Sequence, residues 1–181
     1  MAISTQGRYT RTAKVLHWLV LVLLVAQYAI GWTMPHIGRN TPVSTLISLH
    51  FSIGVVILGL IVVRLIWRII HGEPEAEAGI PPWQVHSARV IHWLLYLLLL
   101  VVPLLGWVNA SYRGMPIMLF GLVPVPQLVG VHAAGWGSTG DIHTLVAEFG
   151  ILPLVGLHVA AALYHYFIRR DRVLQRMLPG V

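Results

Sequence analysis

Two histidines near the end of the chain share one apolar segment, at a spacing that suits metal binding. His143 and His158 lie fifteen residues apart within residues 142–168. In a helix that rises ~1.5 Å and turns ~100° per residue, they would lie roughly 22 Å apart along the axis and point about 60° apart. Imidazole is a common ligand of transition metals. One helix would therefore offer two stacked ligands, provided that other helices bring a histidine to each level.

The composition places these helices in a membrane. Of the 181 residues, 57% are hydrophobic and only 10% are charged, and the mean hydropathy is +0.78. These charges are too few to cover a soluble domain of this size. Four apolar stretches can cross a hydrocarbon layer that takes ~20 helical residues. They are residues 15–34, 44–66, 90–110 and 142–168. The sequence predicts an all-α membrane protein, a single domain over residues 1–181 built as a bundle of four transmembrane helices.

The basic residues predict the orientation of this bundle. The formal net charge is +6, and ten of the twelve Lys and Arg residues lie at one set of helix ends. Arg39 and Arg113 alone lie in the opposite connections. By the positive-inside rule, both termini are cytoplasmic, and the connections after the first and third spans are outside. Because orientation accounts for the basic charge, no nucleic-acid partner is expected.

The place of each histidine along its span gives its depth. His17 follows the basic amino-terminal segment by one turn, and His158 precedes the basic carboxyl-terminal segment on a helix of opposite direction. Both belong to the inner half of the membrane. His50 and His143 each follow an outer turn closely, so both belong to the outer half. The sequence therefore predicts two pairs at two depths, His17 with His158 and His50 with His143.

Four histidines at matched depths favour ligation over structural hydrogen bonds. A histidine within a span is costly unless it is engaged, and a single one is usually satisfied by a neighbouring helix. The chain has no cysteine, which excludes thiolate sites and covalent c-type haem attachment. Two bis-histidine levels without cysteine fit non-covalent b-type haem better than zinc. A non-redox metal or proton pathway in a small transporter is the alternative that the residues leave open.

Short fragments spread over nearly the whole chain form a specific set when they are taken in order. They are His17-Trp18, Leu49-His50, Val63-Arg64-Leu65, Tyr96, Pro103, Gly106, Arg113-Gly114, Pro116, Phe120-Gly121, Gly156-Leu157-His158, His165-Tyr166-Phe167, Met177 and Pro179. In this order they resemble the bacterial cytochrome b561 family, four-helix di-haem membrane proteins that include superoxide oxidase. The resemblance implies a protein of the bacterial inner membrane that holds two b-type haems. The axial ligands that it implies are His17, His50, His143 and His158.

The resemblance also implies a function. Superoxide would give up electrons on the outer side, and the two haems would pass them to ubiquinone, with membrane lipid around the bundle. Arg113 is the candidate that would attract superoxide or bind a haem propionate, and His92, near the inner end of the third span, is the candidate that would supply protons to quinone. The alternative is a haem-bearing subunit that relays electrons between quinone and a dehydrogenase or soluble cytochrome. A redox partner protein and a homodimer both stay open.

One feature departs from the family pattern. The family usually spaces its two fourth-helix ligands by fourteen residues, whereas His143 and His158 are fifteen apart. Pro153 lies between them and cannot donate a hydrogen bond to the carbonyl of Phe149. A kink or a widened helical turn at this point would absorb the extra residue. In the outer connection, residues 117–131 are apolar but interrupted by Gly and Pro, which predicts a lid that lies on the outer surface or dips into it.

Overall fold

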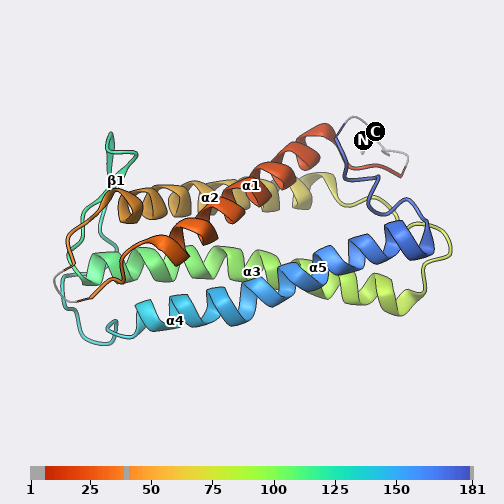
Figure 1. Ribbon diagram of the computed structural model, residues 1–181. Helices are drawn as coiled ribbons and strands as arrows, with labels where there is room; N and C mark the ends of the chain where they lie inside the picture. The colour runs from red at the N-terminus through yellow and green to blue at the C-terminus, as the bar shows by residue number, and fades with distance from the viewer. Residues whose placement is uncertain (1–6, 39–40, 180–181) are drawn as a thin grey trace.

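The computed structural model describes residues 7–38 and 41–179, and within them four helices are long and apolar enough to cross a membrane (Figure 1). The fourth helix, Thr139–Arg169, is continuous but contains two wider π-helical segments. The elements are α1 (Arg11–Thr33), α2 (Thr45–His71), α3 (Pro82–Tyr112), α4 (Thr139–Val146), η1 (Ala147–Ile151), α5 (Leu152–Tyr164) and η2 (His165–Arg169). The predicted all-α membrane bundle of four spans is confirmed.

The helix ends follow local capping rules. Ser44 caps α2, because its Oγ accepts a hydrogen bond from the N–H of Ile47 at 3.4 Å. The helix α3 begins at Pro82 rather than near residue 90, since proline suits the first helical turn and the helix extends beyond its apolar stretch. It then passes through Pro103 without a break. The helices are therefore longer than the hydrocarbon layer requires.

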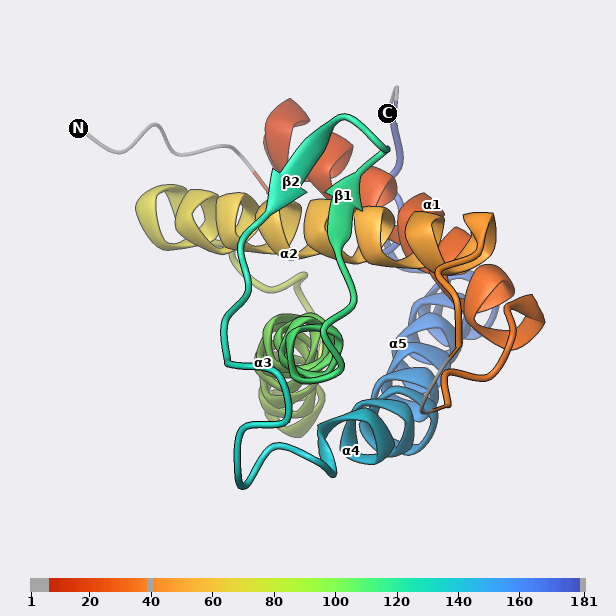
Figure 2. The same ribbon diagram turned by 90° about the vertical axis from the view of Figure 1, so that its left-hand side faces the viewer.

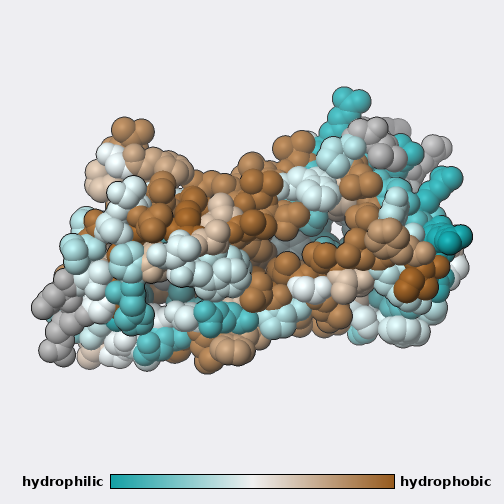
Figure 3. Space-filling view, in the orientation of Figure 1, coloured by the Kyte–Doolittle hydropathy of each residue, from teal (hydrophilic) through white to brown (hydrophobic). Residues whose placement is uncertain are grey.

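Neighbouring helices pack in the order of the sequence. Figure 2 looks along α3 and shows α2 crossing above it and α4 and α5 beside it. A small core draws on all four spans, with Leu24, Ile57, Leu99 and Ile151 among its members. Many other large apolar side chains stay exposed along the helices, and Figure 3 shows the resulting hydrophobic surface over the middle of the molecule. An exposed apolar surface of this extent suits a bundle that lipid surrounds.

The outer connection contains two short strands that the sequence did not predict. Strand β1 (Ile117–Leu119) pairs antiparallel with β2 (Val123–Val125), so that Met118 lies opposite Pro124. Proline is tolerated there because a two-stranded sheet has only edge strands. The predicted lid is thus a hairpin, and it projects away from the helices instead of covering their ends (Figure 1).

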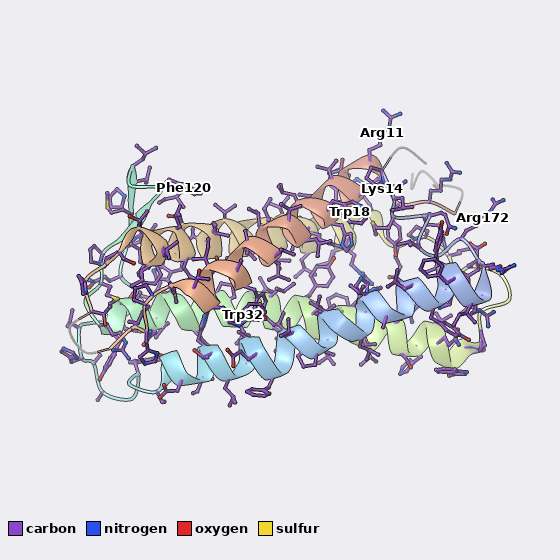
Figure 4. The ribbon with its side chains drawn as sticks, viewed as in Figure 1. Arg11, Lys14, Trp18, Trp32, Phe120 and Arg172 are labelled. Atoms are coloured by element: carbon purple, nitrogen blue, oxygen red, sulfur yellow. The ribbon has the colours of Figure 1, made fainter. Side chains whose placement is uncertain are left out.

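Residues 170–179 fold back over the end of the bundle that carries both termini, which we term the inner end after the predicted orientation. The indole N–H of Trp18 donates to the carbonyl of Met177 at 2.9 Å, and the amine of the buried Lys14 donates to the carbonyl of Leu178 at 2.9 Å. Figure 4 shows Lys14, Trp18 and Arg172 together at this end. The tail therefore braces the first turns of α1, next to His17.

An acidic residue fixes the start of this tail. Asp171 accepts hydrogen bonds from the ring N–H of His165 at 2.5 Å and from the N–H of Val173 at 3.2 Å. Partial burial raises the pKa of Asp171, but these bonds and the nearby Arg169 outweigh it, so the pKa lies below the ordinary 3.8. The carboxylate therefore stays ionised at neutral pH. Its bond to His165 directs that imidazole toward the tail.

Candidate haem-binding site

His143 is held in one orientation by the backbone of a neighbouring helix. It lies on α4, and its Nδ1 is 2.8 Å from the carbonyl oxygen of Val102 on α3. Because a carbonyl only accepts hydrogen bonds, Nδ1 carries the proton. The Nε2 atom then keeps its lone pair, which is the arrangement found in metal-binding histidines whose other nitrogen is hydrogen-bonded. His143 is thus prepared to act as a ligand through Nε2.

The second member of the outer pair faces His143 from α2. The ring centres of His50 and His143 are 6.0 Å apart, and the ring planes meet at 75°. Two imidazoles that bind one metal ion from opposite sides, through bonds of about 2 Å, have ring centres roughly 6 Å apart. Within the described part of the chain, the buried Nδ1 of His50 has no hydrogen-bond partner. The separation of the rings matches axial ligation of a single metal ion.

A cavity surrounds this outer pair. It contains about 1030 Å³ of space free of protein atoms, part of which is open to solvent. Its lining is largely apolar and includes Leu24, Tyr28, Trp32, Phe51 and Leu99, with His50 and His143 among them. Small-molecule and cofactor sites typically have mostly apolar walls with a few polar groups that fix the orientation of the bound molecule. The cavity and the imidazole pair together fit a haem, a flat apolar macrocycle with axial positions for two nitrogens.

Gly106 makes room for the ring of His143. A Cβ atom at position 106 would lie 3.0 Å from Cε1 and 3.1 Å from Nδ1 of that ring. Gly106 is four residues after Val102, so the carbonyl that orients His143 faces the same gap. The missing side chain therefore lets the imidazole approach the backbone of α3.

We expect Gly106→Ala to disturb His143. The added methyl group should destabilise the haem-loaded protein by about 1–3 kcal/mol, as overpacking does in close-packed interiors. It should also shift the midpoint potential of one haem, since the imidazole must move. Thermal unfolding and a redox titration measure these effects. Gly59→Ala on α2 is the matched control, because a Cβ there meets no atom within 4 Å. An unchanged stability and potential in Gly106→Ala would contradict this role.

The inner pair has almost the same geometry as the outer pair. The ring centres of His17 on α1 and His158 on α5 are 6.1 Å apart, and the planes meet at 76°. A third ring joins them, because the ring centre of His92 on α3 lies 5.3 Å from that of His158. The structure therefore brings together both predicted pairs and places His92 at the inner level.

The contact with Arg64 gives His17 of the inner pair a different tautomer from that of His143 in the outer pair. Its Nη1 lies 2.7 Å from Nδ1 of His17, and its Nε donates to the hydroxyl of Tyr96 at 3.0 Å. A guanidinium only donates, so Nδ1 of His17 accepts and the ring proton sits on Nε2. To bind a metal through Nε2 as a neutral imidazole, His17 must move this proton to Nδ1 and release Arg64. Arg64 would then be free to pair with an anionic group such as a haem propionate.

The π-helical segment η1 absorbs the extra residue between His143 and His158. The N–H of Leu152 bonds to the carbonyl of Ala147, five residues earlier, so this turn holds one residue more than an α-helical turn. Pro153 follows directly and cannot donate to the carbonyl of Phe149. The widened turn expected from the sequence is confirmed. It lets two histidines fifteen residues apart face partners at the two levels.

The other candidates lie outside the imidazole pairs. Arg113 ends α3 at the outer end, where its Nη1 donates to the carbonyl of Gly38 at 3.0 Å and its Nε to Oδ1 of Asn109 at 3.1 Å. It is not among the residues that line the cavity. Arg39 lies outside the described residues. Within the described ranges, no group of three or more His, Asp or Glu side chains is placed to hold a metal ion.

The sequence did not reveal the groups that form hydrogen bonds to the candidate ligands His143 and His17. The carbonyl of Val102 and the contact between Arg64 and His17 join residues far apart in the chain. The signal for the former was the pair of Pro103 and Gly106, which marks a place where α3 approaches another element closely. The signal for the latter was an arginine within an apolar span, which requires a partner.

Known proteins resemble this chain over nearly its whole length. The model of the family described as prokaryotic cytochrome b561 matches residues 8–180. A relative in Escherichia coli (strain K12), cytochrome b561 homolog 2, is 30% identical over 181 residues, which cover 97% of this chain and 93% of the relative. The probable superoxide oxidase CybB of Yersinia pestis is 30% identical over 167 residues, 91% of this chain and 92% of that protein. Cytochrome b562 of Cereibacter sphaeroides is 30% identical over 97% of this chain and 98% of its own length.

Proposed function

Because this chain belongs to the prokaryotic cytochrome b561 family, we propose that it is a superoxide oxidase that passes electrons through two b-type haems to ubiquinone. The family carries out electron transfer in membranes and uses b-type haem. The observation that carries the di-haem proposal is the pair of imidazole tiers, with ring centres 6.0 and 6.1 Å apart. The superoxide proposal draws on the similarity to the probable superoxide oxidase of Yersinia pestis.

Each haem would be held by two histidines. His50 and His143 would hold the outer haem, and His17 and His158 the inner one. When bound, the haems supply one-electron redox chemistry. Apolar side chains around the outer pair would limit the access of water to the ligands and lower the local dielectric constant. The hydrogen bond to the carbonyl of Val102 orients the ring of His143, which would hold the haem through Nε2.

The overall reaction conserves electrons and protons. Two superoxide anions each lose one electron and become oxygen, and one ubiquinone takes up both electrons and two protons and becomes ubiquinol. Within this proposal, the positive charge of Arg113 would attract superoxide to the outer end. His92 would supply protons to quinone at the inner level, where its ring lies beside that of His158. Both termini would be cytoplasmic, in the bacterial inner membrane.

A spectroscopic experiment tests the function directly. Purified protein in vesicles should show a reduced-minus-oxidised spectrum of b-type haem, and superoxide should reduce the haems at a rate that a stopped-flow instrument resolves. Added ubiquinone should then reoxidise them. If quinol reduces the haems but superoxide does not, the protein is a relay between quinone and another redox protein. If no b-type absorbance appears, the di-haem proposal is wrong.

Arg113→Gln is expected to slow the reduction of the haems by superoxide about tenfold at low salt, because it removes a positive charge that steers an anion. Arg113→Lys keeps the charge, although it loses the two hydrogen bonds to Gly38 and Asn109. It should therefore retain most of the rate. The rate is measured by stopped flow at two ionic strengths, and equal rates in the glutamine variant and the unmodified protein would count against steering.

His92→Asn tests the supply of protons to quinone. It should leave the reduction of the haems by superoxide unchanged, because His92 lies at the inner level. Reoxidation by ubiquinone should become slower, since this step needs protons. The two half-reactions are followed separately in the same instrument. Loss of haem in this variant would instead assign His92 a structural role beside His158.

A further inference from the structure

The hairpin turn between β1 and β2 is apolar and exposed. Residues 114–135 contain no Asp, Glu, Lys or Arg. At the turn, Phe120 is 53% exposed, Leu122 81% and Val123 55%. In the orientation of Figure 1, Figure 3 shows hydrophobic residues at this projection. An exposed apolar turn without a single charge is a liability in water, and it usually marks a surface that binds something.

The hairpin is fixed to a membrane-spanning helix. The Oγ of Ser52 accepts a hydrogen bond from the N–H of Phe120 at 2.9 Å and lies 3.3 Å from the carbonyl of Met118, to which it donates. Ser52 is fully buried, and Phe51 packs against the buried cluster of Ala110, Met115 and Ile117. Ser52 follows the start of α2 by two helical turns, which is about 10 Å of rise. The hairpin therefore leaves the bundle beside the outer part of a span.

The direction of the hairpin is sideways. In Figure 1 it projects away from α3 to one side of the bundle, at the outer ends of the helices. In Figure 2, which is turned by 90°, it again rises above α2 and away from α3. If the helices cross the membrane, the turn extends along the plane of the bilayer near its outer surface and does not point into the water.

The turn places an aromatic residue in a left-handed backbone conformation. Phe120 and Gly121 have φ values of 50° and 73°, as in the tight turn that joins two antiparallel strands. Glycine and asparagine suit this left-handed conformation, whereas a bulky aromatic residue adopts it only at a cost. An aromatic residue at this position therefore points to a role for its side chain rather than for the turn itself.

We propose that residues 120–123 insert into the boundary between the headgroups and the acyl chains of the outer leaflet, and so anchor the outer connection to lipid. Aromatic side chains favour this boundary. Like the spans, of which Val22 on α1 is an example, the turn exposes large apolar side chains. At this boundary, the unpaired backbone N–H and C=O groups along the edge of the hairpin can form hydrogen bonds to headgroups and water. The hydrocarbon core would provide no such partners. This proposal is independent of the redox function.

Spin labels test the depth of the turn. The chain has no cysteine, so Phe120→Cys and Leu122→Cys each give a single labelling site. The haem-loaded protein is labelled with a nitroxide and placed in vesicles of phosphatidylethanolamine and phosphatidylglycerol. Collision rates with oxygen, which concentrates in the bilayer, and with a water-soluble nickel chelate are then measured. Val22→Cys is the lipid-facing reference, and Ala134→Cys, exposed in the same outer connection, is the matched reference.

The expected result is a ratio of oxygen to nickel collisions that is several-fold higher at positions 120 and 122 than at position 134. Because the turn is uncharged, vesicles of phosphatidylcholine alone should give the same ratio. A ratio equal to that at position 134 would place the turn in water and overturn the proposal. Low collision rates with both reagents would also overturn it, because a protein surface, such as a second copy of the chain, would then cover the turn.

Discussion

His143→Ala is expected to lower the haem content of the purified protein by about half. The variant loses one of two facing imidazoles in the outer cavity, and His50 alone would hold a haem there with a single axial bond. The inner pair, His17 and His158, lies at the other level of the bundle and should keep its haem. Haem is measured as the pyridine haemochrome per mole of protein, and the remaining spectrum should be that of one b-type centre.

The matched control is His86→Ala, which removes an exposed histidine from the inner part of α3. It should keep the full haem content. His158→Ala should also lose about half of the haem, and the double variant His143→Ala with His158→Ala should lose nearly all of it. Size-exclusion chromatography shows whether each variant is folded. Full haem content in folded His143→Ala would mean that the outer pair binds no haem, and the account of the two tiers would be wrong.

Changes of length within the fourth span should have unequal effects. Inserting one alanine between Ile151 and Leu152 lengthens the spacing between His143 and His158 to sixteen residues. It turns the two imidazoles relative to each other by about 100° and moves them apart by about 1.5 Å. One imidazole then no longer faces its partner, so the haem content should again fall by about half.

Deleting Phe149 from η1 should be tolerated. The deletion removes an exposed, lipid-facing side chain and returns the widened turn to an α-helical turn, because η1 holds one residue in excess. Both haems should be retained, and the thermal midpoint should change little. Haem content and thermal unfolding are measured side by side for the insertion and the deletion. The opposite result, a tolerated insertion and a damaging deletion, would show that η1 does not set the register of the ligands.

The sequence by itself predicted that this protein lies in a membrane, and it predicted the depth of each histidine in that membrane. Hydrophobicity, span length and charge asymmetry are properties of local stretches, so the four spans could be predicted without knowledge of packing. The place of each histidine along its span then predicted that His17 and His158 lie in one half of the membrane and His50 and His143 in the other. The predicted spans were shorter than the helices, because polar residues also continue a helix beyond the hydrocarbon layer.

The tertiary structure alone decided which ring meets which and how each is held. The distance between two rings, the bond from His143 to Val102 and the contact between Arg64 and His17 depend on how separate helices cross, which no local pattern encodes. The hairpin was missed for the same reason, since Ser52 on α2 fixes its position across 68 residues of chain. Pro153 marked where the helix had to widen, but only backbone hydrogen bonding shows that the extra residue lies in η1.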